Sequence, residues 1–343
     1  MLSRHLTTRR EAILDGLEFI YRSASDPENF SAYGFDYLFS FLISSKSRDL
    51  TVSQHSTRMG KKFSLTWVEN HQIVPLDVDA DSITELVFGS LSTEQFGVHA
   101  SLKSEIRKAA RRFKPYDYFW FDPAVEPPPR DVPDDCNCGT SNNRGAKVCK
   151  RCRRTLSMMS RYEVWVVALI RSYLGERYGV TLGARYSDVL KWLPHMRPYP
   201  ECEESSNSDF VWSIYAITHI AYTLNDYNSY RLDPRWLPCE FMTLKNSLDD
   251  FIRMADPETV GEILDCLKSF GVSSESTLVQ KGIAYLLSCQ NLDGSWGEPD
   301  VEDIYERCHV TIAAINGLDE YAWRGMRVSF PEIEPRLFQW GSI

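Results

Sequence analysis

The sequence QNLDGSWG occupies residues 290–297 and lies between two stretches with helical hydrophobic spacing. Ser276–Cys289 precedes it, and the apolar and small residues of Ile312–Leu318 follow it. Its two glycines, Gly294 and Gly297, suit a tight turn, because glycine adopts backbone conformations that are closed to other residues. Its tryptophan can stack on the end of the preceding helix. The stretch therefore predicts a helical hairpin.

The rest of the chain repeats this pattern. Apolar residues recur at helical spacing from about Arg9 to Arg22, and alternating patterns typical of strands are absent outside possible short hairpins around the clustered cysteines. The proline density of Pro115–Pro133 predicts a loop. Further helices are predicted at Tyr162–Tyr173, Tyr186–Leu193, Asp209–Leu224, Leu244–Met254 and Pro257–Phe270. The predicted fold class is all-α, an array of helical hairpins.

Asp303, Tyr305 and His309 follow the turn and lead into a helix of small residues. This order of turn, aspartate, tyrosine and small-residue helix resembles the repeats of the α/α-toroid superfamily of terpenoid cyclases and protein prenyltransferase β subunits. The resemblance implies a ring of helical hairpins around a central cavity, in an enzyme that acts on an apolar small molecule. It also implies that Asp303, Tyr305 and His309 face that cavity. Glu306 stands where the prenyltransferases have a zinc-binding histidine.

A second stretch, Asp77-Val-Asp79-Ala-Asp81-Ser82, is similar to the aspartate-rich motif of class II terpene cyclases. The resemblance implies that Asp79 is the general acid that starts cyclisation or isomerisation. In the family a further aspartate directly follows the middle one, whereas Ala80 stands there in this chain. The residues alone also allow a structural interpretation, because Ser82 and Glu85 form a capping box that would place the aspartates at a helix N-terminus.

Four cysteines have the spacing of a metal site. Cys136 and Cys138 form one close pair, and Cys149 and Cys152 form a second. Two such pairs joined by a loop can surround a structural zinc ion tetrahedrally. An iron–sulfur cluster or four reduced thiols are the alternatives.

The cysteine-rich segment also sets the predicted domain organisation, because helices resume directly after it. Residues 1–130 and 157–343 are predicted to be the N- and C-terminal parts of one helical toroid. Residues 131–156 are predicted to be a zinc-binding insertion between them.

A histidine in the middle of an apolar helix offers a further candidate site. His219 lies within Asp209–Leu224, and Asp226 follows seven residues later on the same face. A buried imidazole needs partners for its ring nitrogens, which predicts either a core hydrogen bond or a functional role. If His219 and His309 converge with Asp226 or Asp303, they form a site of two histidines and one carboxylate, suited to non-haem iron. This would be a second metal in the cavity.

Composition limits the partners and the location. The chain has 343 residues and a net charge of −9, so nucleic acid is not expected as a partner, although Lys147–Arg154 is a local basic run. No apolar stretch has the length of a membrane span, and the N-terminus lacks the apolar core of a secretory signal. Four of the nine cysteines have metal-ligand spacing, as expected in a reducing compartment. The cytoplasm is the expected location.

Three functions follow from these features. The first is a biosynthetic isomerase or lyase that performs acid-initiated cyclisation or isomerisation of an apolar small molecule. The second is a metal-dependent enzyme of specialised metabolism on the same fold. The third is a non-catalytic toroid that binds a protein partner through the zinc-binding insertion. The sequence leaves the substrate and the oligomeric state open.

Overall fold

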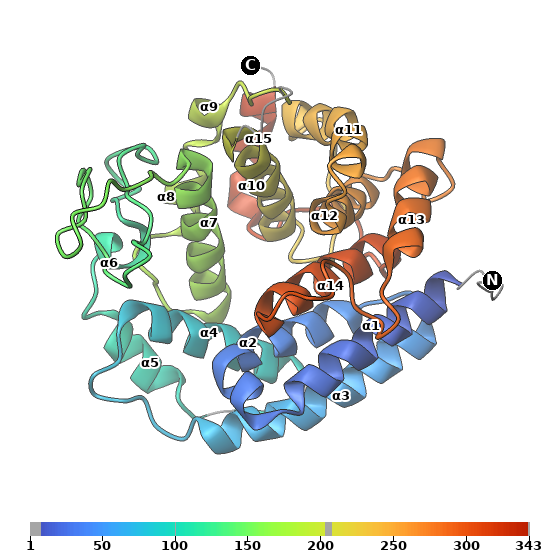
Figure 1. Cartoon of the computed structure of the whole chain (residues 1–343), viewed down its shortest axis with the longest axis horizontal. Helices are drawn as coiled ribbons and strands as arrows, with labels where there is room; N and C mark the ends of the chain where they lie inside the picture. The colour runs from blue at the N-terminus through green and yellow to red at the C-terminus, as the bar shows by residue number, and fades with distance from the viewer. Residues whose placement is uncertain (1–7, 100, 203–207, 342–343) are drawn as a thin grey trace. The chain divides into compact units, whose positions relative to one another are not determined.

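A computed structural model of the chain describes residues 8–99, 101–202 and 208–341. These residues form helices and isolated β-bridges but no strand, so the predicted all-α class is confirmed (Figure 1). The helices are α1 (Arg9–Ala24), α2 (Pro27–Ser44), α3 (Leu50–Asn70), α4 (Ala80–Gln95), α5 (Lys103–Ala110), α6 (Pro115–Phe119), α7 (Arg161–Tyr178), α8 (Tyr186–Leu190), α9 (Leu193–Met196), α10 (Ser208–Leu224), α11 (Pro238–Arg253), α12 (Pro257–Ser269), α13 (Thr277–Cys289), α14 (Ile304–Leu318), the 3-10 helix η1 (Pro331–Ile333) and α15 (Glu334–Gly341).

The helices belong to two compact units. Unit 1 contains residues 1–73, 88–102 and 221–343, and unit 2 contains residues 74–87 and 103–220. Two of the four boundaries between the units fall inside α4 and α10, and the other two lie before α4 and directly before α5. Unit 1 therefore combines the two ends of the chain, while the cysteine-rich segment belongs to unit 2.

The predicted helical hairpin is present in unit 1 as α13 and α14. Gly294 and Gly297 have φ angles of 91° and 88°, which only glycine adopts readily. The side chain of Trp296 is fully buried, and its Nε1 donates to the carbonyl oxygen of Leu286 at 2.8 Å, near the end of α13. The turn is thus held by its tryptophan, as the sequence predicts.

Three helices of unit 1, α2, α14 and α12, run in the same direction. Glu258 contacts His309 near the N-terminal ends of α12 and α14, and Lys268 contacts Gly317 near their C-terminal ends. The residues that follow α2 and α14 also pair, since Ser47 bridges to Tyr321. Parallel helices bring their N-terminal halves, and the side chains on them, to one end of the unit.

Glycines allow α12 and α14 to touch through their backbones. A Cβ atom on Gly261 would lie 2.3 Å from the carbonyl oxygen of Ala313, and one on Gly317 would lie 2.6 Å from Gly261 Cα. Real Cβ atoms do not approach other atoms so closely, so any larger residue would separate the helices. This contact fixes the spacing of the two helices that carry the candidate site described below.

A buried polar network joins the C-terminal ends of the same helices. Lys268 Nζ donates to the carbonyl oxygens of Asn316 at 3.2 Å, of Gly317 at 2.9 Å, and of Asp319. Asp265 Oδ2 accepts from Asn228 Nδ2 at 2.6 Å. The ammonium group therefore satisfies carbonyl oxygens at the end of α14 that no further helical turn can reach.

Asp265 is expected to make stability depend on pH. Burial raises the pKa of Asp265 to about 7, against the opposing charge of Lys268 and the Asn228 hydrogen bond, while Asp319 and Glu320 raise it further. The native state keeps this proton at pH values where the unfolded chain has released it, so this group's contribution to stability falls as pH rises from about 4 to about 7. Asp265→Asn removes the titration. Urea unfolding of both proteins should show the wild type losing stability relative to the variant over that range, and a constant difference would contradict this assignment.

Unit 2 is organised around α7. Trp165 Nε1 of α7 donates to the carbonyl oxygen of Val189 in α8 at 3.1 Å, and Arg171 pairs with Asp81 at 2.7 Å. The prediction of a loop from residue 115 is wrong for its first turn, because α6 begins at Pro115. Proline is tolerated there since the first helical residues need no amide donor.

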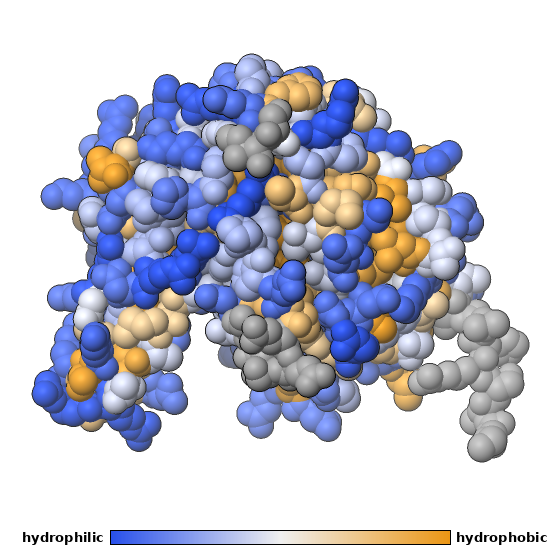
Figure 2. All heavy atoms as spheres, turned by 90° about the horizontal axis from the view of Figure 1, so that it is seen from above, coloured by the Kyte–Doolittle hydropathy of each residue, from blue (hydrophilic) through white to orange (hydrophobic). Residues whose placement is uncertain are grey.

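No helix among the described residues is both long and apolar enough to span a membrane. Hydrophilic side chains make up most of the face drawn in Figure 2, and hydrophobic side chains lie between them in patches.

Candidate metal centres

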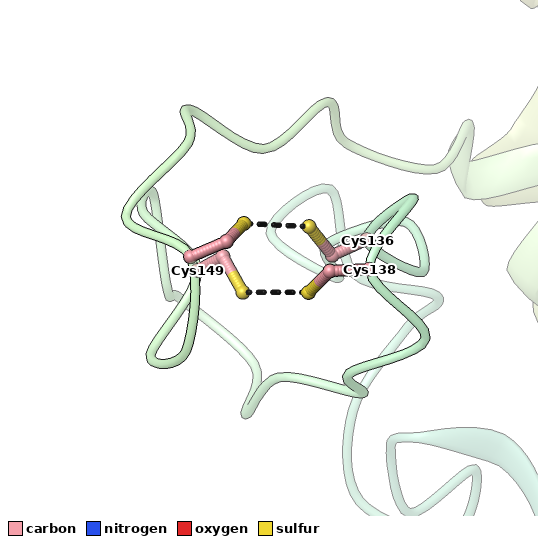
Figure 3. A group of neighbouring side chains, drawn as sticks. Cys136, Cys138 and Cys149 are labelled. Atoms are coloured by element: carbon pink, nitrogen blue, oxygen red, sulfur yellow. Dashed lines mark hydrogen bonds between the residues drawn. The ribbon is translucent and has the colours of Figure 1, made fainter.

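The four clustered cysteines of unit 2 converge on one point. Cys136 Sγ lies 3.4 Å from Cys152 Sγ, and Cys138 Sγ lies 3.7 Å from Cys149 Sγ (Figure 3). All four sulfur atoms lie within 4.8 Å of one another, and the thiols form no disulfide. Tetrahedral zinc–thiolate bonds place sulfur atoms about 3.8 Å apart. The cluster is therefore compatible with a bound metal ion.

Two tight turns position these sulfur atoms. In the first, the Gly139 amide donates to the carbonyl oxygen of Cys136 at 2.7 Å, with Gly139 at a φ of 71°. In the second, the Arg153 amide donates to the carbonyl oxygen of Cys149 at 3.0 Å, with Arg153 at a φ of 64°. Hydrogen bonds from the backbone, chiefly from Cys152, lower the pKa of the Cys149 thiol. A thiolate is the form that binds a metal.

The segment around these cysteines has almost no core of its own. Leu156 and Ala146 are the apolar side chains that pack with the sulfur atoms. The ends of the segment lie together, since Pro133 bridges to Met158 and the Met159 amide donates to the carbonyl oxygen of Val132 at 2.9 Å. So small an apolar cluster cannot stabilise a segment of this length without another cross-link.

A second group of ligand atoms lies in unit 1, near the N-terminal ends of α12 and α14. One carboxylate oxygen from each of Glu258 and Glu262 and one ring nitrogen of His309 all lie within 4.8 Å of one another. Glu258 and Glu262 are one turn apart on α12, so they share a face of the helix. His309 Nε2 lies 3.3 Å from Glu258 Oε1, and the two side chains are 30% and 31% exposed. A ligand can therefore reach this carboxylate–histidine centre from solvent.

Further titratable groups surround the carboxylate–histidine centre. Burial alone would lower the pKa of His309, but the hydrogen bond to Glu258 and the charges of Glu258, Glu262 and Asp36 raise it to about 9. Burial raises the pKa of Asp36 to about 6, although His309 and a hydrogen bond from Tyr305 oppose that shift. Burial and the charge of Asp36 raise the pKa of Tyr305. Three carboxylates facing one imidazole make a strongly negative site, which favours a cation.

Aromatic rings adjoin the carboxylate–histidine centre. The ring of Tyr305 lies 5.7 Å from that of His309 and 4.9 Å from that of Tyr33, measured between centroids. Tyr33 departs from helical geometry within α2, with φ −130° and ψ 16°. Asp36 follows this kink by one turn. The centre thus receives side chains from α2, α12 and α14.

The structure brings together two of the residues predicted to be catalytic, Tyr305 and His309. Asp303 lies at the N-terminus of the same helix, where its exposed carboxylate accepts from the Tyr305 amide at 2.9 Å. Asp226 lies in the turn after α10, with a φ of 56°, and its carbonyl oxygen accepts from Lys46 Nζ at 3.0 Å. Asp303 therefore acts as a helix cap, and the carbonyl oxygen of Asp226 accepts from Lys46 and from Ser229.

The other two predicted residues belong to unit 2. Asp79 Oδ1 accepts from the Ser82 amide at 2.8 Å, and the hydrogen bonds from Ser82 lower the pKa of Asp79. A general acid needs the opposite shift. His219 is buried, and its Nδ1 lies 2.9 Å from the carbonyl oxygen of Tyr215, one turn earlier in α10. The side chain of Asp79 thus bonds to the first turn of α4, and the side chain of His219 bonds to the preceding turn of α10.

Asp36, Glu258 and Glu262 are not among the site residues predicted from the sequence. The spacing of Glu258 and Glu262 offers a signal, because two carboxylates one turn apart are unusual in a helix whose other residues are mostly apolar. Asp36 offers no comparable signal. It becomes recognisable only when the structure places it beside His309 and Tyr305.

Comparisons with known proteins add no further assignment. No family model matches the chain, and neither a curated protein nor a solved structure matches it significantly. The functional argument therefore depends on the geometry of the two centres.

Proposed function

We propose that this protein is a metal-dependent enzyme whose reaction centre is formed by Glu258, Glu262 and His309. The convergence of their three ligand atoms within 4.8 Å carries the proposal. Two carboxylates and one imidazole suit a divalent first-row cation such as Mn²⁺ or Fe²⁺, and they leave coordination positions for water or substrate. A metal ion held in this way can polarise a substrate oxygen or activate a bound water molecule.

The substrate proposed is a small molecule with an apolar portion. The partly exposed rings of Tyr33 and Tyr305 lie beside the proposed metal ligands and offer it an aromatic surface. The parallel run of α12, α14 and α2 is the arrangement that an α/α toroid has on its inner side, so we propose that fold for the helical array. Acid initiation by Asp79 is less well supported, because its lowered pKa keeps it ionised.

We also propose that the four-cysteine site holds zinc and has a structural role. Four thiolates in tetrahedral arrangement are typical of structural zinc, and they leave no open position for a substrate. The paired ends of the segment support its description as an insertion. The chain would then hold a soft metal ion on sulfur and a harder one on oxygen and nitrogen.

Manganese titration of zinc-loaded protein tests the proposed reaction centre. Mn²⁺ prefers oxygen and nitrogen ligands, so the four-cysteine site does not compete for it. Calorimetry and electron paramagnetic resonance should detect saturable binding to the wild type. Glu262→Gln and His309→Ala should each weaken binding by at least about tenfold, as the loss of one ligand does, and should weaken any metal-dependent activity with it.

The matched control is Asp303→Asn, which changes a carboxylate on α14 outside the proposed ligand set. It should leave manganese binding unchanged and also preserve the helix start, because asparagine caps a helix about as well as aspartate does. Absence of saturable binding to the folded wild type would overturn the proposal. So would equal binding by wild type and both ligand variants.

A further inference from the structure

The cysteine-rich segment carries a cluster of unpaired positive charges. Residues 147–156 form a hairpin, in which the Cys149 amide donates to the carbonyl oxygen of Arg154 at 2.8 Å and Val148 bridges to Thr155. The exposed cations of this basic hairpin are Lys147, Lys150, Arg151, Arg153 and Arg154. No carboxylate among the described residues forms an ion pair with them, although other arginines of the chain have such partners.

Unit 1 carries a segment of opposite charge. The exposed carboxylates of this acidic segment, which leads into α14, are Glu298, Asp300, Glu302, Asp303 and Glu306. In the part of the chain that the structure describes, none of them forms an ion pair with a lysine or an arginine. The chain thus displays two short, exposed segments with equal numbers of opposite, uncompensated charges.

We propose that the basic hairpin of one copy binds the acidic segment of a second copy. Complementary charge patches steer association and fix its register, and arginine is enriched at protein interfaces. Val148 and Met158, which are 40% and 37% exposed, add apolar area on and beside the hairpin. Because the two patches differ, one contact links copies head to tail, and two reciprocal contacts close a dimer.

Nucleic acid fits the basic hairpin less well. Residues 133–158 contain no aromatic side chain, whereas single-strand binding depends on base stacking against aromatic rings. The rest of the chain is more acidic than its overall charge of −9, so it would repel a polyanion that approached the hairpin. An acidic segment of limited size on another protein avoids most of that repulsion.

Two variants with reversed charges, measured alone and as a mixture, test the contact. The hairpin variant carries Lys147→Glu, Lys150→Glu and Arg154→Glu, and the segment variant carries Glu298→Lys, Asp300→Lys and Glu302→Lys. These changes spare the Asp303 cap and the Arg151 side chain, which donates to the carbonyl oxygen of Cys138. Sedimentation velocity on the zinc-loaded chain of 343 residues should show the wild type as a dimer or larger at about 0.01 M salt and as a monomer at about 1 M salt.

Each variant alone should be monomeric at low salt, because its two patches then repel. An equimolar mixture should associate again, since the unchanged basic hairpin of the segment variant matches the unchanged acidic segment of the hairpin variant. A control variant carries Lys61→Glu and Lys108→Glu at two exposed positions. This variant should associate as the wild type does. Zinc content and helicity measure whether each variant is folded. If the three glutamates of the hairpin variant cause loss of zinc, a variant with glutamine at the same three positions provides a second test.

Three results would overturn the proposal. A wild type that stays monomeric at low salt excludes the contact, and so does a mixture of folded variants that fails to associate. A monomeric wild type that binds an oligonucleotide, with that binding lost in the hairpin variant, would assign the basic hairpin to nucleic acid instead.

Discussion

Cys149→Ser combined with Cys152→Ser is expected to abolish binding of the zinc ion proposed for the four-cysteine site and to unfold the segment around it. Leu156 and Ala146 provide almost all of the apolar core there, so few apolar contacts hold the two turns together without the metal. Structural zinc contributes on the order of 10 kcal/mol or more to such sites. Metal analysis should find about one equivalent of zinc in the wild type and none in the variant, and hydrogen exchange should show loss of protection across residues 132–159.

The control for this experiment is Cys202→Ser with Cys239→Ser, which changes two exposed cysteines outside the cluster. That protein should retain its zinc and its exchange pattern. A cluster variant that loses all zinc yet keeps full amide protection across residues 132–159 would show that the metal ion is not structural.

Lys268→Met is expected to lower the free energy of unfolding by about 3–5 kcal/mol, the range found when one partner of a buried ionic network is removed. Methionine can replace the apolar stem of lysine, but it cannot donate to the carbonyl oxygens of Asn316, Gly317 and Asp319. It also removes the positive charge that opposes the rise in the pKa of Asp265. Urea unfolding followed by circular dichroism measures the loss.

Lys281→Met is the matched control, since Lys281 pairs with Asp249 at 2.6 Å on the surface and both side chains are more than half exposed. An exposed pair contributes about 1 kcal/mol or less. Similar losses in the two variants would show that the buried ammonium contributes no more than a surface lysine.

The helices that could be predicted from the sequence are those with a clear apolar face and a recognisable start. Ser276 and Asp303 cap α13 and α14, and the turn between these helices follows from its glycines. The helix α3 was not predicted, because its long polar stretch hides a narrow buried face that includes Val52, Met59 and Phe63. Tertiary packing, and not local pattern, identifies such a helix.

The two candidate centres differ in how much local sequence reveals of them. The four-cysteine site could be predicted because its ligands lie within a short segment and their spacing is itself the signal. The carboxylate–histidine centre combines Asp36 with residues 258–262 and 305–309, and no sequence spacing relates these three helices. His309 and Tyr305 were recognised from their neighbours in the chain, whereas the partners that give them a chemical role come from α12 and α2.

The contact between Gly261 and Gly317 has a consequence for how this protein tolerates change. The distance between the backbones that carry Glu262 and His309 is set by main-chain atoms that already touch, so the two side chains start from fixed positions. Capture of an ion would then require little rearrangement, which is the advantage of a rigid receptor. The proposed metal site therefore depends on Gly261 and Gly317, although neither residue has a side chain that could bind a ligand. A single methyl group added at either position would push the two helices, and the donor atoms on them, apart.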